Sequence, residues 1–262
     1  MTKDIFDISG RHIVLTGGLG LLGREFVRAL SSRGAVVHLV DLHDERTAKK
    51  VLRSRINEKN LRHIFYYQAS VLDEDALVKI RGRILKTGSH IHAFIHTAAL
   101  NPKVEGQKGA RYFELENWKK GIDVDVTGAM LCAHVFRKGM KPGSAVVFVS
   151  STYGVVGPDQ SIYPKGFIKP AYYSAGKGAV IALTKYLSAL WGKDGIRVNC
   201  LVFGGVSNKQ SRQFQKRYAK KTPLGRMAEP HEYNGIVLYL VSDASSYATG
   251  AIFTVDGGFT AW

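Results

Sequence analysis

Short, almost continuous apolar runs alternate with longer amphipathic segments along the whole chain. The runs VVHLV (36–40), HAFIH (92–96) and AVVFVS (145–150) contain few polar residues. Runs of this kind are typical of parallel strands that are covered on both faces. Because parallel strands need helical crossovers, the alternation predicts an α/β fold, a doubly wound parallel sheet of about seven strands with helices on both faces.

The spacing of the runs predicts approximate element boundaries. We expect strands at residues 12–16, 35–41, 64–68, 91–97, 144–150, 196–203 and 251–256, and helices at 21–32, 44–59, 73–86, 118–140, 171–191, 209–220 and 230–241. The alternation continues after residue 177 without a change of composition. We therefore expect a single domain over residues 1–262.

Composition and charge narrow the class of function. Of the 262 residues, 45% are hydrophobic, and 37 Lys and Arg against 21 Asp and Glu give a net charge of +16. The charge fits an anionic small-molecule substrate or a solvated, lysine-rich surface. The sequence shows no zinc-finger spacing, recognition-helix pattern or aromatic–basic tract, so no nucleic-acid partner is expected. Without a run of ~18 apolar residues or a signal-peptide pattern, a cytoplasmic protein with no membrane partner is expected.

The cysteines and histidines do not indicate a metal site. Cys132 and Cys200 lie in apolar runs without metal-ligand spacing, which predicts core residues in a reducing compartment. His92, His134 and His231 show no pairing, and His96 fits a packed or capping residue better than a residue of the cleft. We predict no catalytic metal.

The first predicted strand runs into the glycine-rich turn TGGLGLLG (16–23), which opens a helix. Glycines allow a tight turn and let backbone N–H groups approach a pyrophosphate at the positive end of the helix. Gly23 would let the helix pack closely on the strand. With its flanking strand and helix, the turn indicates a Rossmann-type dinucleotide site.

Asp41 closes the next strand. A carboxylate there can accept hydrogen bonds from the adenosine ribose hydroxyls and repel a 2′-phosphate, so NAD is the predicted cofactor. Arg46 lies nearby and leaves NADP possible. The alternative role for Asp41 is to cap the following helix.

Tyr173 and Lys177 are four residues apart in a predicted helix, so their side chains share one face. A nearby ammonium favours phenolate over phenol and lowers the pKa of a tyrosine. Tyr173 could then donate or accept a proton at working pH. A Tyr and a Lys at this spacing also occur in ordinary solvated helices. The pair indicates a catalytic role only together with the other motifs of the chain.

The TGGLGLLG turn, Asp41, the Ser150-Ser151 pair and the helical YSAGK (173–177) together resemble the short-chain dehydrogenase/reductase family. The segments IRVNCLVFGGV (196–206), TPLGRMAEPHE (222–232) and YATGAIFTVDGG (247–258) resemble later landmarks of that family in order and spacing.

The resemblance implies roles for individual residues. Tyr173 would be the general acid or base at the carbinol or carbonyl oxygen, Lys177 would bind the nicotinamide ribose and poise the tyrosine, and Ser151, rather than Ser150, would hold the substrate oxygen. Asp125 stands where the family has an asparagine of the proton relay, and its charge puts that relay in doubt. The implied cofactor contacts are Gly17, Gly20, Leu21, Leu22, Gly23, Asp41, Leu42, Ser70, Val71, Thr97, Ala98, Ala99, Tyr173, Lys177, Gly204, Gly205 and Val206.

The segments SSTYGVVGPD (150–159), YSAGKGAVIALTKYLS (173–188) and NCLVFGGVSNKQ (199–210) are similar to a subgroup linked to bacterial surface-sugar and flagellin-modification pathways. This resemblance implies a polyol, amino-sugar or sugar-phosphate substrate.

Two segments are expected to shape the substrate pocket. Residues 157–170 form an insertion stiffened by three prolines, which is either a pocket wall or an idle surface loop. Residues 204–228 resemble the family's substrate lid. Cations on the lid, and on the loop after the fourth strand, favour an anionic or phosphorylated sugar, although a solvated face explains them equally well. These cations are Lys209, Arg212, Lys216, Arg217, Lys220 and Lys221 on the lid, and Lys103, Lys108 and Arg111 on the loop.

The resulting prediction is an NAD(P)-dependent oxidoreductase that transfers hydride between nicotinamide and a carbinol or carbonyl carbon. Two alternatives stay open. One is a nucleotide-sugar epimerase or dehydratase with tightly bound NAD, which the position of Gly20 favours and the short tail disfavours. The other is a non-catalytic, cofactor-sensing binding protein. The resemblance also implies a homo-oligomer, either a dimer or a tetramer.

Overall fold

The computed structural model describes residues 4–87, 90–101 and 112–262. Seven strands form one sheet in the order β3-β2-β1-β4-β5-β6-β7, and every neighbouring pair is parallel. The strands are β1 (His12–Thr16), β2 (Val36–Asp41), β3 (Ile64–Gln68), β4 (Ile91–His96), β5 (Met140–Ser151), β6 (Arg197–Phe203) and β7 (Ile252–Val255). The predicted Rossmann-type fold is confirmed.

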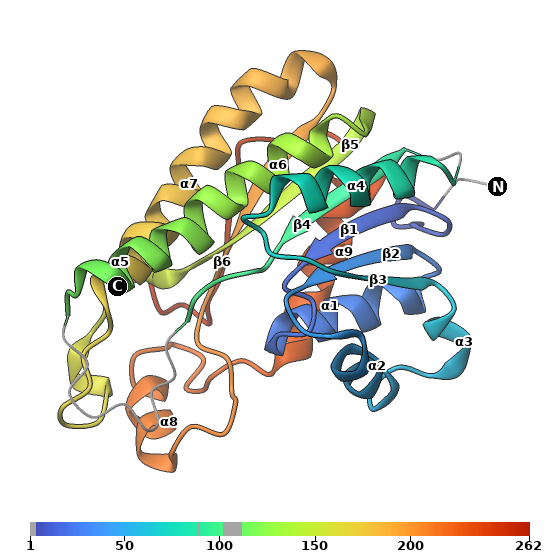
Figure 1. Cartoon of the computed structure of the whole chain (residues 1–262). Helices are drawn as coiled ribbons and strands as arrows, with labels where there is room; N and C mark the ends of the chain where they lie inside the picture. Colours follow the sequence, from blue (N-terminus) through green and yellow to red (C-terminus); the bar gives the residue numbers. More distant parts are fainter. Residues whose placement is uncertain (1–3, 88–89, 102–111) are drawn as a thin grey trace.

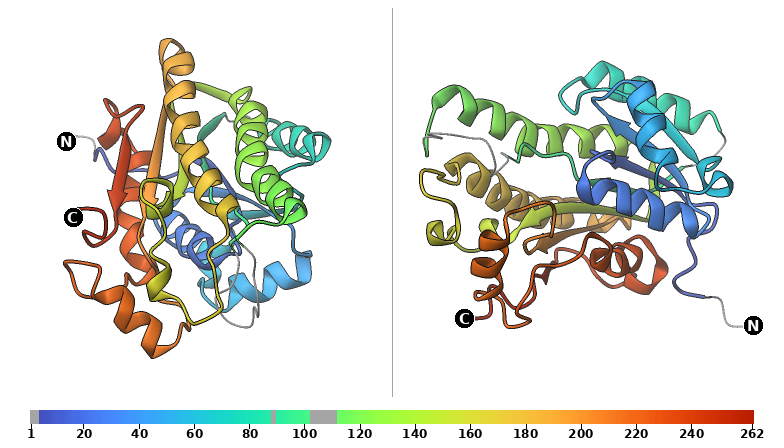
Figure 2. Two further views of the ribbon diagram at one scale, coloured as in Figure 1. Left: turned by 90° about the vertical axis from the view of Figure 1, so that its left-hand side faces the viewer. Right: turned by 90° about the horizontal axis from the view of Figure 1, so that it is seen from below.

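Helices cover both faces of the sheet (Figure 1; Figure 2). One face carries α1 (Leu21–Ser32), α2 (Glu45–Arg53), α3 (Glu58–Leu61) and α9 (Asn234–Val241). The other carries α4 (Glu74–Leu85), α6 (Gly128–Arg137) and α7 (Ala171–Trp191), with α5 (Leu115–Ile122) leading into α6 through a π-helical turn, η1 (Asp123–Thr127). Helix α8 (Arg212–Ala219) lies away from both layers. Short 3-10 turns occur at η2 (Thr152–Gly154), η3 (Gln160–Ile162), η4 (Gly192–Asp194), η5 (Pro230–Tyr233) and η6 (Asp243–Ser245).

The strands are buried on both faces, as their apolar runs predict. In β1, Ile13 and Leu15 belong to the core under α1 and α9, whereas Val14 belongs to the core under α4, α6 and α7. Successive side chains of a strand point to opposite faces. The continuous apolar runs therefore feed two separate cores, one on each side of the sheet.

Five of the seven predicted helices have different bounds in the structure. Those at 73–86 and 209–220 shorten to Glu74–Leu85 and Arg212–Ala219, and the first turn of the one at 230–241 is the 3-10 turn η5. The other two differ more. The helix expected at 44–59 is two helices, because Asn57 caps a new one by accepting a hydrogen bond from the backbone N–H of Asn60 (2.9 Å). The helix expected at 118–140 starts at Leu115 and ends at Arg137. The glycine at 139 and the proline at 142 stop that helix early, so β5 already begins at Met140.

The topology places the predicted functional residues at one edge of the sheet. Because all strands are parallel, their carboxyl ends share that edge. Strand order reverses between β1 and β4, which are hydrogen-bonded neighbours. In open α/β sheets, ligands bind outside the carboxyl ends of the strands at such a switch point.

Candidate active site

The glycine turn after β1 has no room for side chains. Gly17 has a φ of +71°, and a Cβ there would lie 2.6 Å from the backbone nitrogen of Ala98. A Cβ on Gly23 would lie 2.3 Å from the carbonyl oxygen of Gly17. Gly20 caps the N-terminus of α1 with its N–H bonded to the Gly17 carbonyl (3.1 Å). The turn therefore needs glycine, and it leaves backbone N–H groups at the positive end of α1.

The carboxylate of Asp41 lies beside this turn. Its Oδ2 accepts a hydrogen bond from the backbone N–H of Leu19 (3.0 Å), and its Oδ1 lies 2.7 Å from Nδ1 of His43. The helix-capping alternative is wrong, because Asp44 caps α2 by accepting from the N–H of Thr47 (2.7 Å). Asp41 instead lies against the glycine turn, at the carboxyl end of β2.

The other predicted cofactor positions follow strand ends along the same edge. The hydroxyl of Thr97 donates to the carbonyl of Thr16 (2.6 Å), which ties the segment 97–99 to the glycine turn. After β6, the N–H of Gly205 donates to the hydroxyl of Tyr218, which fixes the 204–206 turn against α8. Ser70 and Val71 follow β3; the side chain of Val71 is buried and that of Leu42 is exposed.

The two serines that close β5 have different partners. The hydroxyl of Ser150 donates to the backbone carbonyl of Lys177 (2.8 Å). The hydroxyl of Ser151 accepts from the N–H of Tyr153 (3.2 Å) and retains its own proton to donate. The geometry therefore leaves Ser151 as the serine with a donor available to a substrate.

Tyr173 and Lys177 lie one turn apart in α7, and both are buried. The ammonium of Lys177 donates to the carbonyl of Val149 at the end of β5 (3.2 Å). Its Nζ lies 5.8 Å from the centroid of the Tyr173 ring. The end of β5 thus holds this cation close to the tyrosine.

Asp125 reaches the same site from the π-helical turn. It is 1% exposed, its Oδ1 accepts from the N–H of Leu100 (2.7 Å), and its Oδ2 lies 3.7 Å from Nζ of Lys177. Burial raises the pKa of Asp125, against the opposing effects of Lys177 and of the hydrogen bond from Leu100. The aspartate therefore anchors the segment after β4 and faces the Lys177 ammonium.

A second lysine, Lys169, enters the site from the insertion. Its Nζ lies 3.7 Å from the centroid of the Tyr173 ring and donates to Oδ1 of Asn101 (2.7 Å). Burial first, and the Lys177 charge second, lower the pKa of Lys169 to about 7, against the opposing effect of Asp125. Sequence analysis missed this residue, although the equal spacing of Lys169, Tyr173 and Lys177 is a signal that could have found it.

Aromatic side chains surround the tyrosine. The hydroxyl of Tyr163 donates to that of Tyr153 (3.0 Å), and the ring of Tyr153 meets Tyr173 edge-on at 6.5 Å. Burial raises the pKa values of Tyr153, Tyr163 and Tyr218, so these phenols stay neutral. The buried cluster consists of Tyr153, Ile162, Tyr163, Phe167, Tyr172, Tyr173, Phe214, Tyr218, Met227 and Phe259.

The insertion and α8 are joined to each other. Lys221 forms an ion pair with Asp159 (2.8 Å), and Arg217 donates to the carbonyl of Tyr163 (3.0 Å). Figures 1 and 2 show the insertion in yellow beside α8 in orange. Two of the cations predicted to face an anionic substrate are therefore engaged within the protein. Lys103, Lys108 and Arg111 lie outside the described residues.

The remaining candidates take no part in the site. His96 is buried, its ring nitrogen lies 2.9 Å from the hydroxyl of Thr16, and burial lowers its pKa to about 3, so it is a packed, neutral residue. Both cysteines are buried, which confirms them as core residues. Within residues 4–87, 90–101 and 112–262, no group of three or more His, Cys, Asp and Glu could hold a metal, and no helix is long and apolar enough to cross a membrane.

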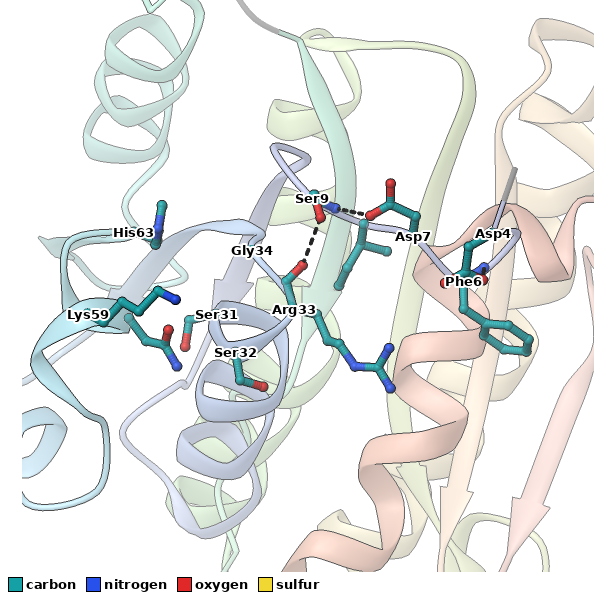
Figure 3. A pocket seen from close by; sticks show the side chains of 12 residues that line it. Asp4, Phe6, Asp7, Ser9, Ser31, Ser32, Arg33, Gly34, Lys59 and His63 are labelled. Carbon is teal, nitrogen blue, oxygen red and sulfur yellow. Dashed lines mark hydrogen bonds between the residues drawn. The ribbon is translucent and has the colours of Figure 1, made fainter. Parts of the chain in front are cut away.

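A pocket of about 400 Å³ lies at the opposite edge of the sheet (Figure 3). Its lining includes Asp4 and residues 6–9 before β1, Arg33 and Gly34 before β2, and His63 before β3. These segments are at the amino ends of the strands, whereas the glycine turn and Ser151 are at the carboxyl ends. The pocket is therefore remote from Tyr173.

Comparison with known proteins decides the family. Residues 20–260 match the family model described as enoyl-(acyl carrier protein) reductase. The 2,5-dichloro-2,5-cyclohexadiene-1,4-diol dehydrogenase of Sphingobium indicum is 30% identical over 97% of this chain and 99% of its own length. The chain belongs to the short-chain dehydrogenase/reductase family.

Other members of the short-chain dehydrogenase/reductase family are similar over almost the whole chain. The NADH-dependent L-xylulose reductase of Ambrosiozyma monospora is 28% identical over 98% of this chain and 97% of its own length. An uncharacterised short-chain type dehydrogenase/reductase of Sinorhizobium fredii, y4vI, is 31% identical over 95% of this chain. This chain spans 44% of the length of y4vI.

Solved structures of short-chain dehydrogenases share the fold. The enzyme from Leptospira borgpetersenii, solved with bound NAD+, has a TM-score of 0.82 and 27% identity, over 99% of this chain and 97% of that one. The structure of gox2181 has a TM-score of 0.85 and 24% identity over 98% of both chains. This short-chain dehydrogenase/reductase is an NAD(P)-dependent oxidoreductase that acts on CH–OH groups.

Proposed function

We propose that this enzyme uses NAD(H) to interconvert a hydroxyl and a carbonyl on a sugar, an amino sugar or a sugar phosphate, as in the subgroup linked to surface-sugar and flagellin modification. One observation carries the proposal. Tyr173 and Lys177 lie one turn apart in α7, and the carbonyl of Val149, at the carboxyl end of β5, accepts from the Lys177 ammonium (3.2 Å).

The residues present fit a dinucleotide. A Cβ would fill the close approaches at Gly17 and Gly23, so the turn at the N-terminus of α1 would hold the pyrophosphate. Asp41 would accept from the adenosine ribose and disfavour a 2′-phosphate, which supports NAD. The 204–206 turn would hold the carboxamide. The bound nicotinamide supplies the hydride chemistry.

The side chains supply proton transfer and orientation. In the oxidation direction, Tyr173 accepts the proton of the substrate hydroxyl, and in reduction it donates that proton back. The hydroxyl of Ser151 donates to the substrate oxygen. The ammonium of Lys177 stabilises negative charge on the Tyr173 oxygen. The surrounding aromatic cluster keeps water away from this transfer.

Exposed cations and the names of relatives support a sugar or sugar-phosphate substrate. Lys209, Arg212, Lys216 and Lys220 are exposed on the segment 204–228 and are available to a phosphate. The names of two relatives likewise specify a cyclic diol and L-xylulose.

The proposal extends to the pocket walls and the assembly. Residues 157–170 would form one wall, and residues 204–228 would form the lid. Helix α7 exposes Tyr186 and Leu190, which supports burial of this helix between copies of the chain in a dimer or tetramer.

A substrate panel tests the proposal. NAD-linked turnover is measured on free hexoses and polyols, their phosphate esters and nucleotide-linked sugars, over a series of salt concentrations. We expect a phosphate ester to give the highest kcat/KM, with a value that falls as salt rises. If a neutral sugar and its phosphate ester were turned over equally at every salt concentration, the proposed phosphate recognition would be contradicted and the proposed sugar substrate would stand.

Two controls define failure of the proposal. Crotonyl thioester is included because the matched family model carries the name of an enoyl reductase. Turnover of that thioester alone, with no carbinol substrate, would contradict the proposal. The variant Tyr173→Phe should lose turnover on every substrate while binding NADH as the unmodified enzyme does.

A further inference from the structure

The tyrosine has two ammonium groups beside it, and only that of Lys177 belongs to the proposed machinery. The second, Lys169, is 7% exposed and has its Nζ 3.7 Å from the centroid of the Tyr173 ring. We propose that Lys169 is a positioning residue that favours the anionic form of Tyr173 and so adjusts the pH at which this tyrosine transfers its proton. The inference rests on the proposed role of Tyr173.

The local structure holds Lys169 in place. Its backbone N–H donates to Oε1 of Gln160 (3.1 Å), and its Nζ donates to Oδ1 of Asn101 (2.7 Å). Pro170 follows directly, caps α7 and fixes the backbone between the lysine and the helix. The segment after β4 and the insertion therefore place the ammonium against the ring.

Three charged side chains face each other around the ring: Lys169, Lys177 and Asp125. The neighbouring phenols are neutral. Asp125 lies 3.7 Å from Nζ of Lys177 and opposes its positive charge. The hydrogen-bond partner of Lys169 is the neutral amide of Asn101, so its charge acts on the ring without a paired carboxylate of its own. Lys169 therefore places a second positive charge beside the Tyr173 ring, whose other cation, Lys177, already lies 3.7 Å from the Asp125 carboxylate.

The electrostatics work in both directions. A cation over an aromatic face is attracted by the ring, and the attraction grows when the ring becomes a phenolate. Burial and Lys177 lower the pKa of Lys169 to about 7, so the charged form of Lys169 is less favoured here, relative to the neutral form, than it is in water. A phenolate at Tyr173 would supply that stabilisation, and each charged form favours the other.

The variants Lys169→Met and Lys169→Gln remove the charge, and Lys169→Arg keeps it. Lys165→Met is the matched control, because Lys165 is an exposed lysine of the same insertion. The first readout is the ultraviolet absorbance of tyrosinate against pH in the protein without substrate, with the titration of Tyr173→Phe subtracted. The second is the pH dependence of kcat/KM for oxidation.

In Lys169→Met and Lys169→Gln, we expect the tyrosinate transition and the rising limb of kcat/KM to move up by about one pH unit. Lys169→Arg and Lys165→Met should follow the unmodified protein. Adding Asp125→Asn to Lys169→Met should move the transition back down, because the opposing carboxylate is gone. Two neutral variants are used, so the test can still be carried out if one of them fails to fold.

An unshifted transition in a folded neutral variant, with only a lower melting temperature, would overturn the inference and leave the proposed function intact. Conversely, a shifted transition in a protein that turns over no carbinol would support the role of Lys169 and contradict the proposed function. The absorbance titration needs no substrate, so the two failures can be told apart.

Discussion

The hydroxyl of Ser150 donates to the backbone carbonyl of Lys177 over 2.8 Å, and so joins the end of β5 to the middle of α7. The hydroxyl of Ser151, the next residue, accepts from the N–H of Tyr153 and keeps its own proton to donate. We expect Ser150→Ala to lower the free energy of unfolding by about 1 kcal/mol, the value of one buried hydrogen bond, with little change in kcat/KM. We expect Ser151→Ala to keep its stability and lose roughly a hundredfold in kcat/KM. Denaturant unfolding and steady-state kinetics measure the two effects, and a reversed pattern would show that the serines have been assigned the wrong way round.

Asp41 should set the choice between the two nicotinamide cofactors. Replacing its carboxylate in Asp41→Ala removes the repulsion of a 2′-phosphate. We expect the ratio of kcat/KM with NADP to that with NAD to rise by about tenfold or more, which corresponds to ~1.4 kcal/mol. Glu45→Ala is the control, since Glu45 is an exposed carboxylate that pairs with Lys49 on the following helix. An unchanged ratio of kcat/KM with NADP to that with NAD in Asp41→Ala would show that Asp41 does not contact the adenosine ribose.

The ion pair between Lys221 and Asp159 joins the insertion to the segment after α8. Both partners are partly exposed, so the coupling should be modest, about 0.2–1 kcal/mol. We expect Lys221→Met and Asp159→Asn each to raise KM roughly two- to fivefold with little effect on kcat, since the pocket walls lose their fixed arrangement while the catalytic residues keep theirs. The double variant should resemble either single one, and Lys165→Met, which removes an exposed lysine of the insertion outside this ion pair, serves as the control. Fully additive effects on KM would mean that the two segments act independently.

Acid should destabilise the fold through buried histidines. Burial and neighbouring His12 lower the pKa of His38 to about 4, so between about pH 6.5 and 4 the unfolded chain binds a proton that the folded chain does not. Stability is therefore lost as pH falls through this window, by about 2 kcal/mol from His38 at pH 5. His92 and His96 act in the same direction. In His38→Phe, the slope of unfolding free energy against pH should flatten between pH 7 and 5, whatever the absolute stability. If the curve of unfolding free energy against pH in His38→Phe were parallel to that of the unmodified protein and only displaced, His38 would be excluded as a cause of the acid destabilisation.

Sequence patterns predicted the parts of this protein that depend on local chemistry. Apolar runs located all seven strands, and the spacing of Tyr173 and Lys177 in one helix followed from helical periodicity alone. The glycine turn was recognisable because the lack of space at Gly17 and Gly23 permits no other residue. These features are determined mainly by residues that lie close together in the sequence.

The missed features depend on how distant segments meet. Lys169 precedes α7, and its four-residue spacing from Tyr173 is only an indirect signal, because the contact forms when the insertion folds against Asn101 and the Tyr173 ring. Arg217 and Lys221 were read as cations facing a substrate, yet their partners lie more than fifty positions away in the sequence. Asp44, rather than Asp41, caps α2, and two aspartates so close together could not be separated by pattern alone.

The π-helical turn at Asp123–Thr127 has an evolutionary consequence. Such a turn accommodates one residue more than an α-helical turn of the same rise. Deleting a single residue here would restore a regular helix with α5 and α6 in nearly their present orientation, because the wider turn only absorbs the extra residue. The residues of the turn would repack, and Asp125 would lose its contacts with the Lys177 ammonium and the Leu100 N–H. Insertions and deletions should therefore be rarer in this stretch of homologous genes than point substitutions, even though it lies inside a helix that looks continuous in outline.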